Sequence, residues 1–399
     1  MKSKITAMAL FVFTAGTVAL YPPTQSHGTV VTVDPTPIAP VVTQADKIEV
    51  VFVLDTTGSM SGLIQAAKDK IWSIANTMVS AQSAPEIKMG LVAYRDRGDT
   101  YVTQVLDLSA DLDSMYAKLM DFRAAGGGDG PESVNQALYD AVHKMSWSQD
   151  QNAYRVVFLV GDAPPHMDYQ DDVKYPQTLK EAKQKGIVVN TIQCGRNGRT
   201  LQTWKQVAHL GDGRYFQVDQ AGGAVALATP FDEKLAELSR KLDGTRLYYG
   251  STEEKAKQSK KVEATDKLHA KSSLGSRARR ATFNVSKSGA ANLVGEGELV
   301  DDVTSGRVDL SGVDRDHLPG PMQDMSVEEQ NAVINETAER RNELKGQIQE
   351  LAQQRSAYLE KEVEELGGAK DSLDVQIYRT VREQAGKLGL RYDAAAPAY

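Results

Sequence analysis

The sequence is poor in the residues that build disulfide frameworks and soft-metal centres. It has one cysteine, Cys194, and six histidines among 399 residues. A single cysteine excludes an intramolecular disulfide framework, a zinc ribbon and an iron–sulfur cluster. With so few sulfur and imidazole ligands, any bound metal should be a hard cation held by oxygen atoms.

Excess positive charge is lacking as well. The formal net charge is −7, which argues against nucleic acid or an anionic membrane surface as the main partner. The sequence also lacks a Gly-x-Ser-x-Gly motif, a His-Glu-x-x-His motif and a Walker loop, so we do not expect an enzyme. A hydrophobic content of 41% and a charged content of 25% are typical of a globular protein.

The N-terminus has the pattern of a targeting segment. Lys2 and Lys4 precede an uncharged, mostly apolar run that ends at Leu20, as in a secretory signal. We expect residues 1–20 to direct export to the periplasm or the exterior, as a cleaved signal or as an uncleaved membrane anchor. Residues 21–45 are rich in proline and are expected to form an extended linker.

Residues 46–245 alternate strand-like runs with amphipathic helices. The first run, 48–54, is almost entirely β-branched or apolar, as expected for a strand buried on both faces. Further strands are expected at 87–94, 101–108, 156–160, 187–192 and 215–218. Helices are expected at 63–78, 111–122, 131–145, 179–185, 201–210 and 231–242. This order predicts a doubly wound, mostly parallel α/β sheet with helices on both faces, and a hairpin at the second and third strands.

Polar residues follow the first predicted strand at a spacing of two. Asp55, Thr57 and Ser59 come directly after it. Alternate side chains of an extended segment point the same way, so one carboxylate and two hydroxyls can converge there. The competing interpretation is a turn of Asp, Ser and Thr residues that caps the next helix.

Two further loops place carboxylates near the same edge of the predicted sheet. Asp162 follows the strand 156–160, and Asp129 lies in a glycine-rich loop that enters a helix. Ligands of doubly wound folds bind beyond the carboxyl ends of the central strands. Carboxylates and hydroxyls from three such loops suit Mg²⁺, Mn²⁺ or Ca²⁺.

At these residues the chain resembles the von Willebrand factor type A (VWA) domain family. That family has a metal-ion-dependent adhesion site with the pattern Asp-x-Ser-x-Ser, a threonine on a second loop and an aspartate on a third. The resemblance places Asp55, Thr57 and Ser59 on the first motif, and Asp162 on the third-loop aspartate. It implies a bound divalent cation and a protein partner that contacts the metal-site face.

The second loop departs from the family pattern. Where the family usually has threonine, this sequence offers Asp129, with Glu132 and Ser133 as rivals for the same position. A third carboxylate would leave the site net negative, which strengthens retention of the metal and weakens attraction for an acidic partner. We therefore expect tight binding, to Ca²⁺ as readily as to Mg²⁺.

The C-terminal third is less informative. Residues 246–325 are expected to form a basic, irregular linker region, in which 253–281 is a solvated helix or linker. Ser326 and Glu329 have capping-box spacing and open a predicted helix of about 40 residues. Its narrow, coiled-coil-like apolar stripe is interrupted by Arg355, so a stable parallel dimer is not specified. A second helix is expected at 373–388, and the two would form a helical hairpin within 326–399.

The sequence thus predicts an exported module that binds a protein in a divalent-cation-dependent way, for adhesion or assembly. The alternative is a structural scaffold. In that case the metal only stabilises the loops, and the C-terminal helices bind the partner.

Overall fold

The computed structural model describes residues 45–82, 84–128, 130–221, 227–365 and 373–392. The predicted targeting segment 1–20, nearly all of the linker 21–45, and Asp129 lie outside the described residues.

Within the described residues, six strands form one sheet in the order β3-β2-β1-β4-β5-β6. Their bounds are β1 Lys47–Asp55, β2 Glu86–Tyr94, β3 Thr103–Ser109, β4 Ala153–Gly161, β5 Ile187–Cys194 and β6 Asp212–Val218. The pair β2–β3 is the predicted antiparallel hairpin, and the other pairs are parallel. The predicted doubly wound α/β fold is confirmed. The strand order reverses direction between β1 and β4, so ligands are expected at the carboxyl ends of these two strands.

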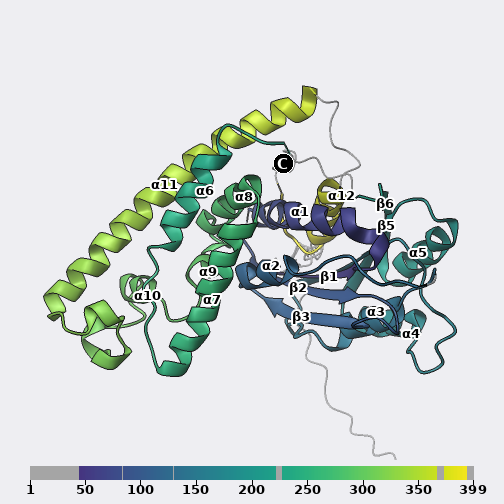
Figure 1. Cartoon of the computed structure of the whole chain (residues 1–399), viewed down its shortest axis with the longest axis horizontal. Coiled ribbons are helices and arrows are strands. Elements are labelled where there is room, and N and C mark those ends of the chain that lie inside the picture. Colours follow the sequence, from purple (N-terminus) through teal and green to yellow (C-terminus); the bar gives the residue numbers. More distant parts are fainter. Residues whose placement is uncertain (1–44, 83, 129, 222–226, 366–372, 393–399) are drawn as a thin grey trace, which may run out of the picture. The chain divides into compact units, whose positions relative to one another are not determined.

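Helices cover both faces of the sheet (Figure 1). Alternate residues of β1 point to opposite faces. Phe52 and Leu54 enter a core with α1 (Ser61–Val79) and α2 (Leu112–Leu119). Val51 and Val53 enter a second core with α3 (Val134–His143), α4 (Tyr175–Gln184) and α5 (Gly198–Leu210). Burial on both faces explains why β1 is apolar at consecutive positions.

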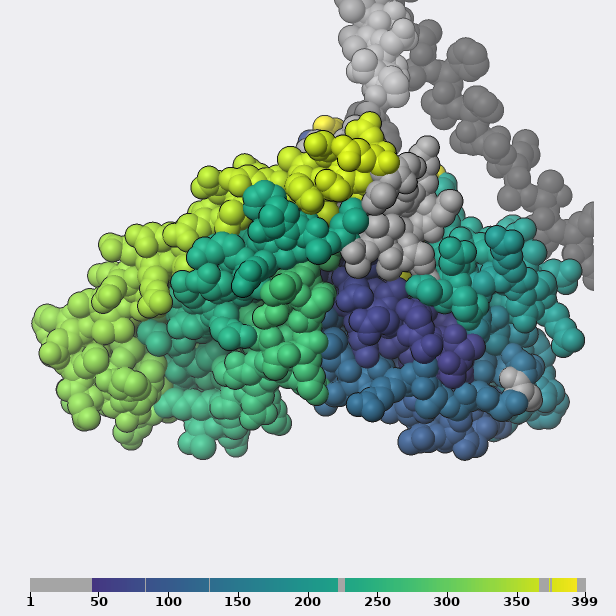
Figure 2. Space-filling view, turned by 45° about the horizontal axis from the view of Figure 1, so that its top comes forward, coloured from purple at the N-terminus to yellow at the C-terminus, as the bar shows by residue number. Residues whose placement is uncertain are grey.

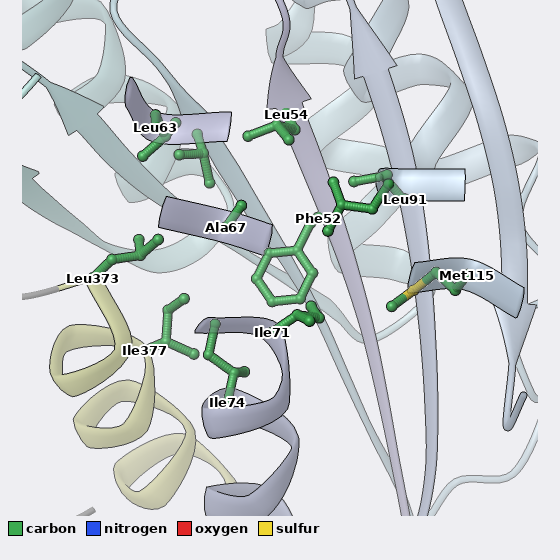
Figure 3. Close-up of a pocket in the computed structure, with 12 residues that line it drawn as sticks. Phe52, Leu54, Leu63, Ala67, Ile71, Ile74, Leu91, Met115, Leu373 and Ile377 are labelled. Carbon is green, nitrogen blue, oxygen red and sulfur yellow. The ribbon is translucent and has the colours of Figure 1, made fainter. Parts of the chain in front are cut away.

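The last helix, α12 (Leu373–Gly386), completes the first of these cores. Leu373 and Ile377 point at Phe52 of β1 and at Ile74 of α1 around a small apolar cavity (Figure 3). Helix α12 packs on α1 and β6, whereas the preceding helix α11 (Val327–Glu365) packs on α6 (Asp232–Asp243), α8 (Leu274–Val285) and α10 (Leu299–Thr304).

The expected hairpin of α11 and α12 is therefore wrong. Among the described residues the two helices share only a small apolar cluster, in which Val363 contacts Val375. The apolar stripe of α12 is instead buried by the sheet. The stripe of α11 is buried by helices of the same chain, as Figure 2 shows for α11 lying along α6.

The expectation of an irregular linker at 246–325 is also wrong, apart from the solvated helix that is one of the two expectations for 253–281. These residues are all described, and they contain α7 (Thr252–Lys271), α8, α9 (Ala290–Val294) and α10. Several of their charged side chains are buried, because acidic residues of other elements pair with them. Arg280 of α8 is fully buried and forms ion pairs with Asp113 of α2 and Asp243 of α6.

Two arginines of α11 hold it against its neighbours. Arg341 donates to both carboxylate oxygens of Glu298, each at 2.9 Å. Arg355, which interrupts the predicted heptad pattern, is buried and donates from Nε to Asp232 Oδ1 of α6 at 2.7 Å. Arg355 thus interrupts the apolar stripe because it forms an ion pair within the chain. No described helix combines the length and the apolar character needed to cross a bilayer.

Both ends of the described chain meet at the amino edge of the sheet. The amide of Ala45, just before β1, donates to the carbonyl of Leu388 at 2.9 Å, and Gln82 N donates to Arg391 O at 2.9 Å. The carboxyl ends of β1 and β4 lie at the opposite edge. The point where the linker joins the sheet is therefore remote from the predicted site.

Candidate metal-binding site

The first loop gathers three oxygen-bearing side chains at the end of β1. Asp55 is fully buried. Its Oδ1 accepts hydrogen bonds from Thr57 N at 2.8 Å and from Thr57 Oγ1 at 2.7 Å. The Thr57 hydroxyl lies 3.4 Å from Ser59 Oγ. Asp55 Oδ2 is buried and has no hydrogen-bond partner within the described part of the chain.

Backbone hydrogen bonds tie the first loop to the second. Gly58 N donates to Gly126 O at 3.1 Å, and Ala125 N donates to Thr56 O at 3.2 Å. Gly126 has φ +76°, and a side chain there would collide with the Asp99 carboxylate. Glycine is therefore required at this turn.

The third loop brings Asp162 beside Asp55. Leu54 of β1 lies opposite Val160 of β4 in the parallel ladder, so Asp55 is level with Gly161 and Asp162 follows one residue further along β4. A Cβ on Gly161 would lie 3.0 Å from Asp55 Cβ. The glycine thus allows the two strand ends to approach closely.

The second and third loops are joined by the backbone of Glu132. Glu132 N donates to Pro164 O at 2.9 Å, and His166 N donates to Glu132 O at 3.0 Å. The three loops therefore form one connected unit at the carboxyl edge of the sheet.

Of the two rivals for the second-loop position that the structure describes, Glu132 is the one whose side chain faces the first loop. A Cβ on Gly127 would lie 3.0 Å from Glu132 Oε1 and 3.1 Å from Thr57 Cβ. Glu132 is buried, and its Oε2 has no hydrogen-bond partner among the residues that the structure describes. Ser133 is engaged elsewhere, because its hydroxyl donates to Asp96 Oδ1 at 2.9 Å.

The electrostatics of this edge disfavour unneutralised carboxylates. Burial raises the pKa of Asp55 to about 7 against the opposing hydrogen bonds from Thr57, and the charge of Asp162 adds to the rise. Burial also raises the pKa of Glu132 to about 9, and the charge of Asp55 is the next largest cause. Positive charge placed here would lower both pKa values.

The predicted ligands are oxygen atoms, which are the donors that a hard cation prefers. No group of three or more His, Cys, Asp or Glu side chains in the described ranges is arranged to hold a metal ion. The described set is instead the carboxylates of Asp55 and Asp162 with the hydroxyls of Thr57 and Ser59. The buried, unpartnered Asp55 Oδ2 is an acceptor of the kind that oxygen-seeking cations use.

One side chain lies at this edge although no pattern in the sequence predicts it there. Gln220, just beyond β6, donates from Nε2 to Asp162 Oδ2 at 2.6 Å. Neither the composition nor the spacing around Gln220 indicates this contact. It depends on the sheet order, which brings the loop after β6 close to the ends of β1 and β4.

The fold and the loop cluster define a doubly wound α/β domain, and a comparison with known families agrees with this. Residues 49–230 match the family model described as the von Willebrand factor A domain. This segment is therefore similar to that family, and the C-terminal helices follow the matched residues.

Curated relatives are similar over part of the chain. The alpha-protein kinase vwkA of Dictyostelium discoideum is 29% identical over 128 residues, which cover 31% of this chain and 19% of the relative. The von Willebrand factor A domain-containing protein 7 of Rattus norvegicus is 39% identical over 114 residues, 29% of this chain and 12% of the relative. The chain thus spans less than a fifth of either protein.

A solved structure, that of the SpRpn10 VWA domain, is 16% identical to this chain with a TM-score of 0.34. The match covers 44% of this chain and 89% of that one.

Proposed function

We propose that the carboxyl edge of β1 and β4 binds a divalent cation, Mg²⁺ or alternatively Ca²⁺ or Mn²⁺, and that a protein partner binds at this face. The VWA domain is typically a protein-interaction module. The observation that carries the proposal is the buried Asp55 carboxylate, with one oxygen unpartnered in the described structure, beside the hydroxyls of Thr57 and Ser59.

The residues of this edge would contribute to cation binding in different ways. Asp55 and Asp162 would balance the charge of the cation, directly or through water, and Thr57 and Ser59 would be hydroxyl ligands. Glu132 would act from the second loop, with Asp129 as the alternative outside the described residues. The bound cation would offer one open position to an oxygen atom of the partner. A second-loop carboxylate makes a neutral oxygen or water the preferred occupant of that position.

We also propose that the protein is exported by residues 1–20. The linker 21–45 would join the domain at the amino edge of the sheet, where Ala45 pairs with Leu388.

Replacing Asp55 by asparagine should weaken cation binding at least 10-fold, because the buried charge that faces the cation is lost. Calorimetric titration of the full chain with Mg²⁺, Ca²⁺ and Mn²⁺ measures this. Asp266→Asn is the matched control, since Asp266 is an exposed aspartate of α7 and should leave the affinity unchanged. Equal affinities of wild type and Asp55→Asn, or no binding by any of the three ions, would refute the proposal.

The same variants separate the binding module from the scaffold alternative. In a pulldown from the producing cell, capture of a partner should be lost with EDTA and with Asp55→Asn. Capture that persists in both cases, while circular dichroism shows a folded protein, would instead favour binding through the C-terminal helices.

Replacing Glu132 by glutamine should weaken cation binding by roughly 10-fold, as expected for a carboxylate that lies close to the ligands. The side chain keeps its size, so the packing at Gly127 is preserved. Asp129→Asn and Ser133→Ala, titrated in parallel, compare the three rivals for the second-loop position. A larger loss in either of these variants than in Glu132→Gln would reassign that position.

A further inference from the structure

Gln220 reaches across the candidate site from the turn that follows β6. Its Nε2 donates to Asp162 Oδ2 at 2.6 Å and to the backbone carbonyl of Ser59 at 3.3 Å. The same nitrogen lies 3.9 Å from Met60 Sδ. One exposed carboxamide therefore connects the first and third loops of the site.

The backbone at Gly195, which follows β5, lies directly against this side chain. Gly195 has φ +75°, and its amide donates to Val218 O at 3.0 Å, which holds the two strand ends together. A Cβ at Gly195 would lie 2.3 Å from Gln220 Oε1. Any residue larger than glycine at position 195 would therefore occupy the space in which the carboxamide of Gln220 lies.

The position of the amide group has a chemical consequence. An N–H donor carries partial positive charge, and here it occupies a carboxylate oxygen and a carbonyl oxygen, which are the acceptors that a hard cation also favours. We propose that Gln220 is an intramolecular occupant of this edge that competes with the divalent cation for Asp162. This inference rests on the cation site proposed above and adds its regulation: the carboxamide has to leave Asp162 before that carboxylate can serve the cation.

The opposite role makes the opposite prediction. If Gln220 merely positioned Asp162 for the cation, its removal would leave that carboxylate less ordered and would weaken binding. The sign of the change in affinity therefore decides between the two roles.

The experiment is a calorimetric titration of the full chain with Mg²⁺ and, separately, with Mn²⁺. Gln220→Ala should bind each ion roughly 5- to 10-fold more tightly than wild type, the effect of removing one competing hydrogen bond. Gln220→Glu should bind at least as tightly as Gln220→Ala, because it loses the donor and adds a negative charge beside Asp162.

Gln217 provides the matched control. It is an exposed glutamine of β6 whose Nε2 donates to Gly195 O at 2.8 Å. Gln217→Ala therefore removes a hydrogen bond to the same glycine and leaves the contact of Gln220 with Asp162 in place. Its affinity should equal that of wild type. A comparable rise in the cation affinity of Gln217→Ala would assign the effect to the backbone at Gly195 and overturn the role of Gln220.

Failure of this inference can be distinguished from failure of the cation site. If wild type binds the ions and Asp55→Asn does not, the cation site stands. An equal or lower affinity of Gln220→Ala then overturns the competition alone. If neither wild type nor Gln220→Ala binds, the cation site itself is refuted, and the competition with it.

Discussion

Replacing Arg280 by methionine is expected to destabilise the protein by about 3–5 kcal/mol. Arg280 is fully buried and donates to two carboxylates, with Nε to Asp113 Oδ1 at 2.6 Å and Nη1 to Asp243 Oδ2 at 2.7 Å. The substitution keeps the length of the side chain and removes its charge. Two buried carboxylates would then share a site without their main cation, so much of the loss is the cost of their uncompensated charge.

Urea denaturation followed by circular dichroism measures the free energy of unfolding. Arg307→Met is the matched control, because Arg307 also contacts two aspartates, Asp301 and Asp302, but at an exposed position. That variant should lose no more than about 1 kcal/mol. Similar losses in the two variants would show that the buried network contributes no more than a surface pair.

The effect of Arg280→Met should depend on pH. Burial alone would raise the pKa of Asp113 and of Asp243, yet the charge and hydrogen bonds of Arg280 hold both pKa values below the ordinary value of 3.8. At Asp243 a hydrogen bond from His269 and the charge of Arg246 add to this lowering of the pKa. Their contribution to stability is therefore present above about pH 4 and is lost as the pH falls toward their folded-state values. Without Arg280, burial raises both pKa values and ionisation becomes destabilising. The difference between wild type and variant should thus be largest near neutral pH and shrink below pH 4.

The sheet could be predicted from the sequence because its strands carry a strong local signal. β1 and β4 are buried on both faces, and such strands appear as uninterrupted apolar runs. Asp55 and Asp162 could be predicted to lie at the same edge for a related reason. Each follows one of these runs directly, and the carboxyl ends of parallel strands share one edge of a sheet.

Most of the helices within residues 246–325 could not be predicted in the same way. A segment rich in lysine and arginine has the composition of a solvated linker. What buries Arg280 is Asp113, which lies 167 positions earlier in the chain. Local composition carries no information about such a distant partner. The contact of Gln220 with Asp162 was missed for the same reason.

The hairpin of α11 and α12 was an error of a different kind. Leu373, Ile377 and Val381 recur at helical spacing in α12 and form its buried face. A stripe shows which residues are covered but not what covers them. The adjacent helix in sequence was the economical choice, whereas the sheet had an uncovered apolar surface beside α1 that this stripe fits.

Replacing Ile377 by alanine tests whether α12 belongs to the core of the α/β domain that contains the sheet. Ile377 is 1% exposed and contacts the cluster that contains Phe52 of β1 and Ile74 of α1. Removing its buried carbon atoms beside an existing small cavity should cost about 2–5 kcal/mol, because the surroundings cannot fully collapse onto the space. Urea denaturation followed by tryptophan fluorescence measures this, since Trp72 lies in the same core on α1.

Arg379 lies on the exposed side of the same helix, and Arg379→Ala should change the stability by no more than about 0.5 kcal/mol. A loss confined to Ile377→Ala, with a single transition by both fluorescence and circular dichroism, would place α12 and the sheet in one cooperative unit. The core of this α/β domain would then be complete only with residues that follow the long α11 helix in the chain. A change below about 0.5 kcal/mol in Ile377→Ala would instead mean that the sheet is stable without the buried face of α12.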